Sequence, residues 1–149
     1  MREYWRQPAL TEEALAGGWL HTGDIAVQDD TGRLYIVDRK KDMIVTGGFN
    51  VYPKEVEDAR ASHPAVGQSA VVGAPDAKWG ETVRAYVVLR AGASASEAEL
   101  IAHVKALKGS VNAPKHLDFT SALPQTALGK IDKKALRALH WGGQSRSVS

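Results

Sequence analysis

The alternation of apolar and polar residues along the first quarter of the chain predicts a short helix followed by a β-hairpin. The segment 11–15 is helix-like, and the glycine pair at 17–18 stops it. A short strand follows Asp24, and the apolar segment 33–37 forms the returning strand. The turn residues at 29–32 connect the two strands, so we expect an antiparallel hairpin.

Strand and helix patterns alternate after residue 42. Short apolar segments bounded by turn residues predict further strands at 43–45, 68–72, 83–89 and 115–119. Helical patterns occupy 53–60, 96–108 and the stretch from Asp132 to Leu139. The segment 47–51 is predicted to be a loop, because its two glycines allow a sharp turn. The predicted fold class is therefore α+β: a small domain in which a β-hairpin precedes a three-stranded sheet covered by helices.

Local signals define the ends of these helices. Pro53 suits the first helical position. Ser96 and Glu99 fit a capping box, and Gly109 ends the same helix. Asp132 is a suitable N-cap for the last helix. The residues predicted to face the core are Leu100, Val104 and Leu107 in the helix at 96–108, and Leu136 and Leu139 in the last helix.

Composition excludes several classes of function. The chain has no cysteine, which excludes disulfides, thiolate metal sites and a cysteine nucleophile, and fits a cytoplasmic protein. Its five histidines lack the spacing of a helical metal pair, so no metal site is predicted. The net charge is +2 and basic residues alternate with acidic ones, which argues against nucleic-acid binding. The apolar runs have strand length, so no membrane span is predicted.

Three segments in a fixed order resemble the AMP-forming adenylating superfamily, which includes acyl-CoA synthetases, luciferases and peptide-synthetase adenylation domains. They are GGWLHTGD at 17–24, VDRKKDMIVTGGFNVYPKEVE at 37–57 and LPQTALGKIDKKALR at 123–137. One such motif is a weak signal, whereas three in register are a strong one. The resemblance covers the chain from about Tyr4 to Leu139, and it implies the fold of the C-terminal lid domain of an acyl-CoA ligase.

The resemblance implies that Asp24 and Arg39 contact the ribose of AMP. A carboxylate on a tight turn can accept hydrogen bonds from both vicinal ribose hydroxyls, and a guanidinium offers a planar fork of donors. The residues by themselves leave simpler interpretations open. Asp24 is then a turn-capping aspartate, and Arg39 is a surface cation paired with Asp38 or Asp42.

The charged segment 38–42 is implied to be a hinge with Lys41 as its pivot, whereas its residues alone predict an ordinary solvated turn. Gly47, Gly48 and Phe49 are implied to adjoin the pantetheine arm of CoA. Glycine leaves room for a narrow tunnel there, and Phe49 supplies an apolar wall. The alternative for these three residues is a tight turn with a core aromatic residue.

Lys130 is the candidate catalytic residue. The resemblance implies that its ammonium enters the active site during adenylation and bridges the substrate carboxylate and the α-phosphate of ATP. The simpler interpretation is a solvated lysine close to Lys133 and Lys134. The preceding Gly129 and the turn-rich loop before it argue against that interpretation.

The resemblance also implies a domain organisation. Residues 1–37 belong to the rim of a large N-terminal adenylation domain, 38–42 form the hinge, 43–140 form the lid domain, and 141–149 form a flexible tail. The Gly-rich phosphate loop and the acyl pocket of that large domain do not occur in this sequence. We therefore expect residues 1–20 to be poorly ordered, or to pack against a second copy in a homodimer.

The predicted function is the lid of an acid–CoA ligase, which converts a carboxylic acid with ATP to acyl-AMP and then to acyl-CoA. The segment GFNVYP at 48–53 favours a fatty or medium-chain acid. ATP, AMP and CoA are the expected small-molecule partners, with Mg bound through the missing N-terminal domain and the ATP phosphates. Without that domain we expect the chain to be inactive.

The sequence leaves other functions open. The same fold could be a stand-alone partner-binding or regulatory module, and a small basic protein could bind nucleic acid with steep salt dependence. Within the adenylating superfamily, luciferase-like or amino-acid-adenylating chemistry is also open, because the acyl pocket is not in this sequence.

Overall fold

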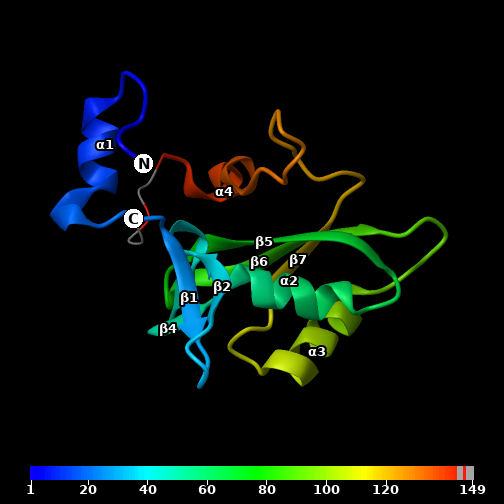
Figure 1. Ribbon diagram of the computed structural model, residues 1–149. Helices are drawn as coiled ribbons and strands as arrows, with labels where there is room; N and C mark the ends of the chain where they lie inside the picture. Colours follow the sequence, from blue (N-terminus) through cyan, green and yellow to red (C-terminus); the bar gives the residue numbers. More distant parts are fainter. Residues whose placement is uncertain (144–145, 147–149) are drawn as a thin grey trace.

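The computed structural model describes residues 1–143 and Arg146. These residues form a two-stranded sheet and a five-stranded sheet (Figure 1). The smaller sheet is an antiparallel hairpin of β1 (Asp24–Gln28) and β2 (Leu34–Arg39). The predicted hairpin is therefore confirmed.

The larger sheet has the strand order β4–β3–β6–β5, with β7 beside β6. Its longest pair consists of β5 (Val66–Asp76) and β6 (Gly80–Leu89), which run antiparallel. β7 (His116–Phe119) runs parallel to β6. β3 (Ile44–Thr46) meets the start of β6, and β4 (Phe49–Val51) returns along β3. The segment after the hairpin is thereby built into the main sheet.

Helices cover both faces of the larger sheet (Figure 1). α2 (Pro53–Ala61) and α3 (Glu97–Lys108) lie on one face, and α4 (Lys133–Trp141) lies on the other. α1 (Pro8–Ala14) stands apart from the sheet, on the N-terminal side of the hairpin. None of the helices in residues 1–143 is long and apolar enough to cross a membrane.

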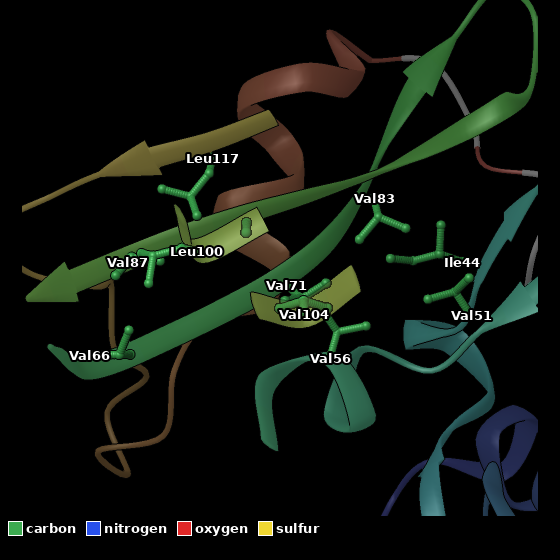
Figure 2. Close-up of a cluster of buried hydrophobic side chains, with 11 residues drawn as sticks. Ile44, Val51, Val56, Val66, Val71, Val83, Val87, Leu100, Val104 and Leu117 are labelled. Carbon is green, nitrogen blue, oxygen red and sulfur yellow. The ribbon is translucent and has the colours of Figure 1, made fainter. Parts of the chain in front are cut away.

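Alternating side chains of β5 and β6 build a core on each face of the sheet. Val71 and Val83 belong to the core shared with Val56 of α2 and Val104 of α3 (Figure 2). The second core lies on the α4 face and consists of Ala70, Val72, Tyr86, Leu123 and Leu136. Full burial of an aliphatic side chain contributes about 1.5–3 kcal/mol. The two cores therefore bind three helices firmly to the sheet.

The predicted helix caps are confirmed. Ser96 Oγ accepts a hydrogen bond from Glu99 N (3.2 Å), and Glu99 Oε2 accepts one from Ser96 N (3.4 Å), which completes the capping box. Asp132 Oδ1 accepts a hydrogen bond from Ala135 N (3.0 Å) at the start of α4. These caps satisfy backbone donors that a helix cannot satisfy internally.

The α+β class is confirmed, but the sheet has more strands than predicted. The expected loop at 47–51 contains β4, whose last residue is fully buried. Leu107 and Leu139 were predicted to face the core, yet they are 55% and 69% exposed. Helical periodicity identifies a face of a helix but does not say how far the facing layer extends along it. Leu139 instead borders an open hollow beside Phe119.

Residues 1–20 differ from the expected poor order, because the structure folds them into α1 and a 3₁₀ turn at Ala16–Gly18. Pro8 occupies the first helical position, where it leaves no intrahelical hydrogen bond unmade. Ala14 is buried, and its carbonyl accepts a hydrogen bond from His21 N (2.8 Å). Most of the predicted tail, at 144–145 and 147–149, lies outside the described residues.

Candidate functional site

Asp24, the first residue of β1, and Arg39, the last residue of β2, form an ion pair at the open end of the hairpin. They are direct cross-strand partners, and Arg39 Nε lies 2.9 Å from Asp24 Oδ1. The Arg39 side chain is 58% exposed, whereas that of Asp24 is 21% exposed. Strand register therefore fixes the carboxylate, while much of the guanidinium surface remains accessible to a ligand.

The observed pairing differs from the simpler interpretations of these two residues. Arg39 pairs with Asp24, and not with Asp38 or Asp42 as the surface-cation interpretation had it. In the turn before β1, the backbone N–H of Asp24 donates a hydrogen bond to Thr22 Oγ1 (3.1 Å), so the side chain that accepts a hydrogen bond there is that of Thr22. The Asp24 carboxylate is thus turned toward Arg39.

An open hollow of about 850 Å³ lies beside this ion pair. Its volume is within the range of small-molecule sites in proteins. The hairpin side contributes Asp24 and Arg39, the following turn contributes Lys40 and Lys41, and the N-terminal segment contributes residues that include Tyr4, Leu10 and Glu13. The hollow therefore brings three of the predicted site residues together. The contribution of α1 was missed, because it depends on how α1 packs and not on a local motif.

The charged segment after β2 is not simply a solvated turn. It forms a 3₁₀ turn at Lys40–Asp42, in which Lys41 is exposed. Asp42 is instead half-buried and pairs with Arg137 of α4, with Oδ1 and Nη1 2.6 Å apart. Asp38 is buried at the end of β2. Acidic residues at both ends of the segment are thus anchored, while Lys40 and Lys41 between them face solvent.

Gly47 and Gly48 form the two-residue turn between β3 and β4, in which Thr46 pairs with Phe49. Both glycines have positive φ values, of 56° and 84°, as a tight hairpin of this kind requires. Phe49 is 60% exposed, so the alternative of a core aromatic residue is wrong. A Cβ on Gly47 would lie 2.6 Å from Trp79 Cε3, so the strand pair has no room for a side chain there.

Lys130 lies at the end of a closed turn that precedes α4. Thr126 N donates to Lys130 O (2.7 Å), and Lys130 N lies 3.3 Å from Thr126 Oγ1. Gly129 has a φ of 75°, which lets the turn close. The Lys130 side chain is exposed, and within residues 1–143 and 146 no carboxylate oxygen lies within 4 Å of its Nζ. The loop before α4 thus presents a free ammonium group on a hydrogen-bonded turn.

The predicted site residues do not all meet in this arrangement. Lys130 and the turn at 47–49 are absent from the lining of the hollow that holds Asp24 and Arg39. Lys130 lies on the loop that leads into α4, whereas Asp24 lies on the separate hairpin (Figure 1). In the described part of the chain, no group of three or more His, Asp or Glu side chains could hold a metal ion.

Comparison with known proteins matches this chain to one domain family and to part of several longer relatives. The family described as AMP-binding enzyme C-terminal domain matches residues 55–130. A medium/long-chain-fatty-acid–CoA ligase of Mycobacterium tuberculosis is 57% identical over 97% of this chain and 27% of its own length. A long-chain-fatty-acid–CoA ligase of Bacillus subtilis is 46% identical over 91% of this chain and 24% of its own length. This chain therefore spans about a quarter of the length of these relatives.

Two crystal structures of MatB from Rhodopseudomonas palustris differ in how well they match this chain. The ATP-bound form superposes with a TM-score of 0.84 at 37% identity, over 93% of this chain and 28% of MatB. The apo form superposes with a TM-score of 0.70 at 38% identity, over 92% and 28%. This chain thus superposes better on the ATP-bound structure than on the apo structure. The fold, the site motifs and these matches together show that the chain belongs to the AMP-binding enzyme C-terminal domain family.

Proposed function

We propose that this domain is the lid of an ATP-dependent, AMP-forming acid–CoA ligase that acts on a fatty or medium-chain acid. Lys130 is the observation that carries the proposal. Its ammonium is exposed on a closed turn, with no carboxylate within 4 Å among the described residues. The similarity to two fatty-acid–CoA ligases supports the substrate class.

The proposed role of Lys130 is electrostatic. In the first half-reaction the substrate carboxylate attacks the α-phosphate of ATP and pyrophosphate leaves, so two anionic groups must approach each other. An ammonium between them offsets this repulsion. One charge pair at 4 Å contributes about 4 kcal/mol at an effective dielectric constant near 20. Lys130 is suited to this role because no carboxylate in the described residues neutralises it.

The proposed role of Asp24 and Arg39 is to hold the ribose of AMP beside the hollow. Asp24 Oδ1 is engaged by Arg39, which leaves its second oxygen available to a ribose hydroxyl. The exposed guanidinium of Arg39 adds further donors. The ion pair therefore holds the carboxylate in a fixed orientation before the nucleotide arrives.

In the second half-reaction, the CoA thiol attacks the acyl-AMP carbonyl and AMP leaves. We propose that the lid, residues 43–140, rotates about Lys41 between the two steps, so that the turn Gly47–Phe49 faces the pantetheine arm. The exposed ring of Phe49 and the open space beside Gly48 suit a narrow channel, whereas Gly47 packs against Trp79. Mg is proposed to enter with the ATP phosphates and the large domain.

The proposed partner is an N-terminal adenylation domain that completes the active site. Large apolar side chains on the first 37 residues are exposed, which suits a surface covered by another domain. Trp5, Trp19, Leu34 and Ile36 are each at least 70% exposed. A second copy of this chain is the alternative occupant of this surface. The cytoplasm remains the predicted location.

The experiment joins this chain to its N-terminal adenylation domain and compares wild type with Lys130→Ala in the two half-reactions. Loss of such a charge stabiliser is expected to slow acyl-AMP formation by roughly 100- to 1,000-fold. Thioester formation from supplied acyl-AMP should persist. Lys134→Ala, at an exposed lysine on the adjacent helix, is the matched control and should leave both steps unchanged. Equal slowing by both variants would contradict the proposal.

A further inference from the structure

Hydrogen bonds on both sides bracket the proposed pivot. On the hairpin side, Lys40 N donates to Gly23 O (2.8 Å). On the lid side, Arg146 Nη1 donates to Lys41 O (2.7 Å). Between these two anchored groups lie only the φ and ψ torsions of Lys40 and Lys41. A rotation of the lid that preserves both anchors must therefore take place at these torsions.

The anchor on the lid side is a buried network. Arg146 Nε and Nη2 bind the carboxylate of Glu81 at 2.9 Å and 2.7 Å, and Nη2 also donates to Met43 O (2.8 Å). Glu81 is 2% exposed, so breaking this ion pair would leave a buried carboxylate without its partner. Asp42 adds its own pair with Arg137 of α4. Side-chain contacts thus tie the segment after Lys41 O to the lid, although the backbone nitrogen of Met43 also lies 3.2 Å from Arg39 O across the pivot.

Asp38 makes a contact that crosses the pivot. Its Oδ2 accepts a hydrogen bond from Lys54 N (2.8 Å), and its Oδ1 accepts one from Arg39 N (2.7 Å). Asp38 lies on the hairpin strand β2, whereas Lys54 lies in the first turn of α2 on the lid. Among the described residues, no other side-chain hydrogen bond or ion pair joins the chain before Lys40 to the chain after Lys41.

This contact also supplies a cap that α2 lacks. The N-cap position of α2 is Tyr52, whose side chain makes no capping hydrogen bond. A carboxylate at a helix N-terminus accepts a hydrogen bond from a free backbone N–H and interacts favourably with the helix dipole. Because Asp38 is buried, these backbone donors replace hydrogen bonds that water would otherwise supply. Rotation at Lys40 and Lys41 would separate Asp38 from α2, and would leave Asp38 Oδ2 and Lys54 N without this hydrogen bond.

We propose that Asp38 is a positioning residue, a latch that holds the lid in the orientation of this structure by capping α2 from across the hinge. As a whole, this chain superposes better on the ATP-bound than on the apo form of the relative compared above. The catalytic consequence rests on the proposed function: the latch favours the ATP-dependent half-reaction. The latch itself is a property of this chain and can be tested without ligase activity.

The test measures the distance between hairpin and lid in this chain by pulsed electron resonance. The absence of cysteine allows spin labels at Arg33→Cys on the hairpin and Lys105→Cys on α3 without background. Both positions are exposed. We expect one dominant distance in the labelled parent. With Asp38→Ala, a second distance should appear, with its population raised about tenfold, as loss of a charge-assisted hydrogen bond predicts.

Two further variants separate latching from helix stability. Tyr52→Asp gives α2 a cap on its own side of the hinge. When it is added to Asp38→Ala, the urea concentration at the midpoint of unfolding should return to the parent value, whereas the second distance should persist. Asp42→Ala removes a half-buried carboxylate whose partner moves with it on the lid, so it should leave the distance distribution unchanged. An unchanged distribution in Asp38→Ala, or full reversal by Tyr52→Asp, would overturn the proposal.

In the complete ligase, Asp38→Ala with Tyr52→Asp should slow acyl-AMP formation about tenfold relative to thioester formation from supplied acyl-AMP, since the latched orientation is populated less. An equal effect on both half-reactions would overturn the catalytic part of the proposal. A parent protein inactive in both half-reactions would contradict the proposed function, while the distance measurement on this chain would still decide the latch.

Discussion

Arg60 provides a direct test of how a buried charge affects the stability of this domain. Its side chain, on α2, is fully buried, and none of its three guanidinium nitrogens has a hydrogen-bond partner among the described residues. Burial lowers the pKa of Arg60 to about 10, and the nearby Glu57 opposes this effect. The change predicted to stabilise the protein is Arg60→Met, which keeps an unbranched apolar side chain and removes the charge.

The pKa gives the size of the effect. Each tenfold weakening of proton binding corresponds to about 1.4 kcal/mol, so the buried charge costs about 3 kcal/mol at neutral pH. Because the folded-state pKa is lowered, this penalty is complete below pH 10 and fades only as the pH rises above it. Some packing is lost with the shorter side chain. We therefore expect Arg60→Met to raise the free energy of unfolding by about 1–3 kcal/mol.

The assay is urea unfolding followed by the fluorescence of the four tryptophans. With a slope of about 2 kcal/mol per molar urea, the midpoint should rise by roughly 0.5–1.5 M. Arg60→Lys is the matched control, because it keeps a buried cation and should bring no such gain. A lower midpoint for Arg60→Met would refute the reasoning, since it would mean that the guanidinium stabilises the fold.

Two further substitutions test local features of the fold. Gly47→Ala forces a side chain into a positive-φ position against the ring of Trp79. In the same urea assay it should lower the free energy of unfolding by about 1–2 kcal/mol. An unchanged midpoint would contradict this prediction. Asp29 accepts hydrogen bonds from Thr31 and Arg33, which hold its pKa at about 2, so the hairpin turn should keep this stabilisation above pH 4 and lose it as the pH falls through 2. Asp29→Asn should abolish that acid transition in the amide signal of Arg33, and its persistence would count against the assignment.

Local signals in the sequence predicted the parts of the fold that depend on neighbouring residues. Ser96 and Asp132 cap their helices as expected, because a side chain that reaches two or three residues along the chain needs no tertiary context. The strand β4 was missed because the glycine turn at 47–48 resembles a loop until its two flanking strands pair. Burial of Arg60 could not be foreseen either, since helical spacing alone does not distinguish a buried arginine from a solvated one.

In the candidate site, too, local motifs were predictable from the sequence whereas long-range contacts were not. The motif around Asp24 and the motif around Arg39 were both visible in the sequence, but their pairing depends on the register of the hairpin. The anchors of the hinge, Asp38 and Asp42, were predicted to be solvated, because their partners lie 16 and 95 residues away along the chain. Contacts at such separations leave no periodic signal in the sequence.

The most direct test of the proposed function is the rate of acyl-AMP formation by the complete ligase with and without the ammonium of Lys130. Single-turnover adenylation should slow by roughly 100- to 1,000-fold in Lys130→Ala, while the transfer of acyl groups from supplied acyl-AMP to CoA continues. Adenylation at the wild-type rate in that variant would contradict the assignment of Lys130, and with it the proposed mechanism of this lid.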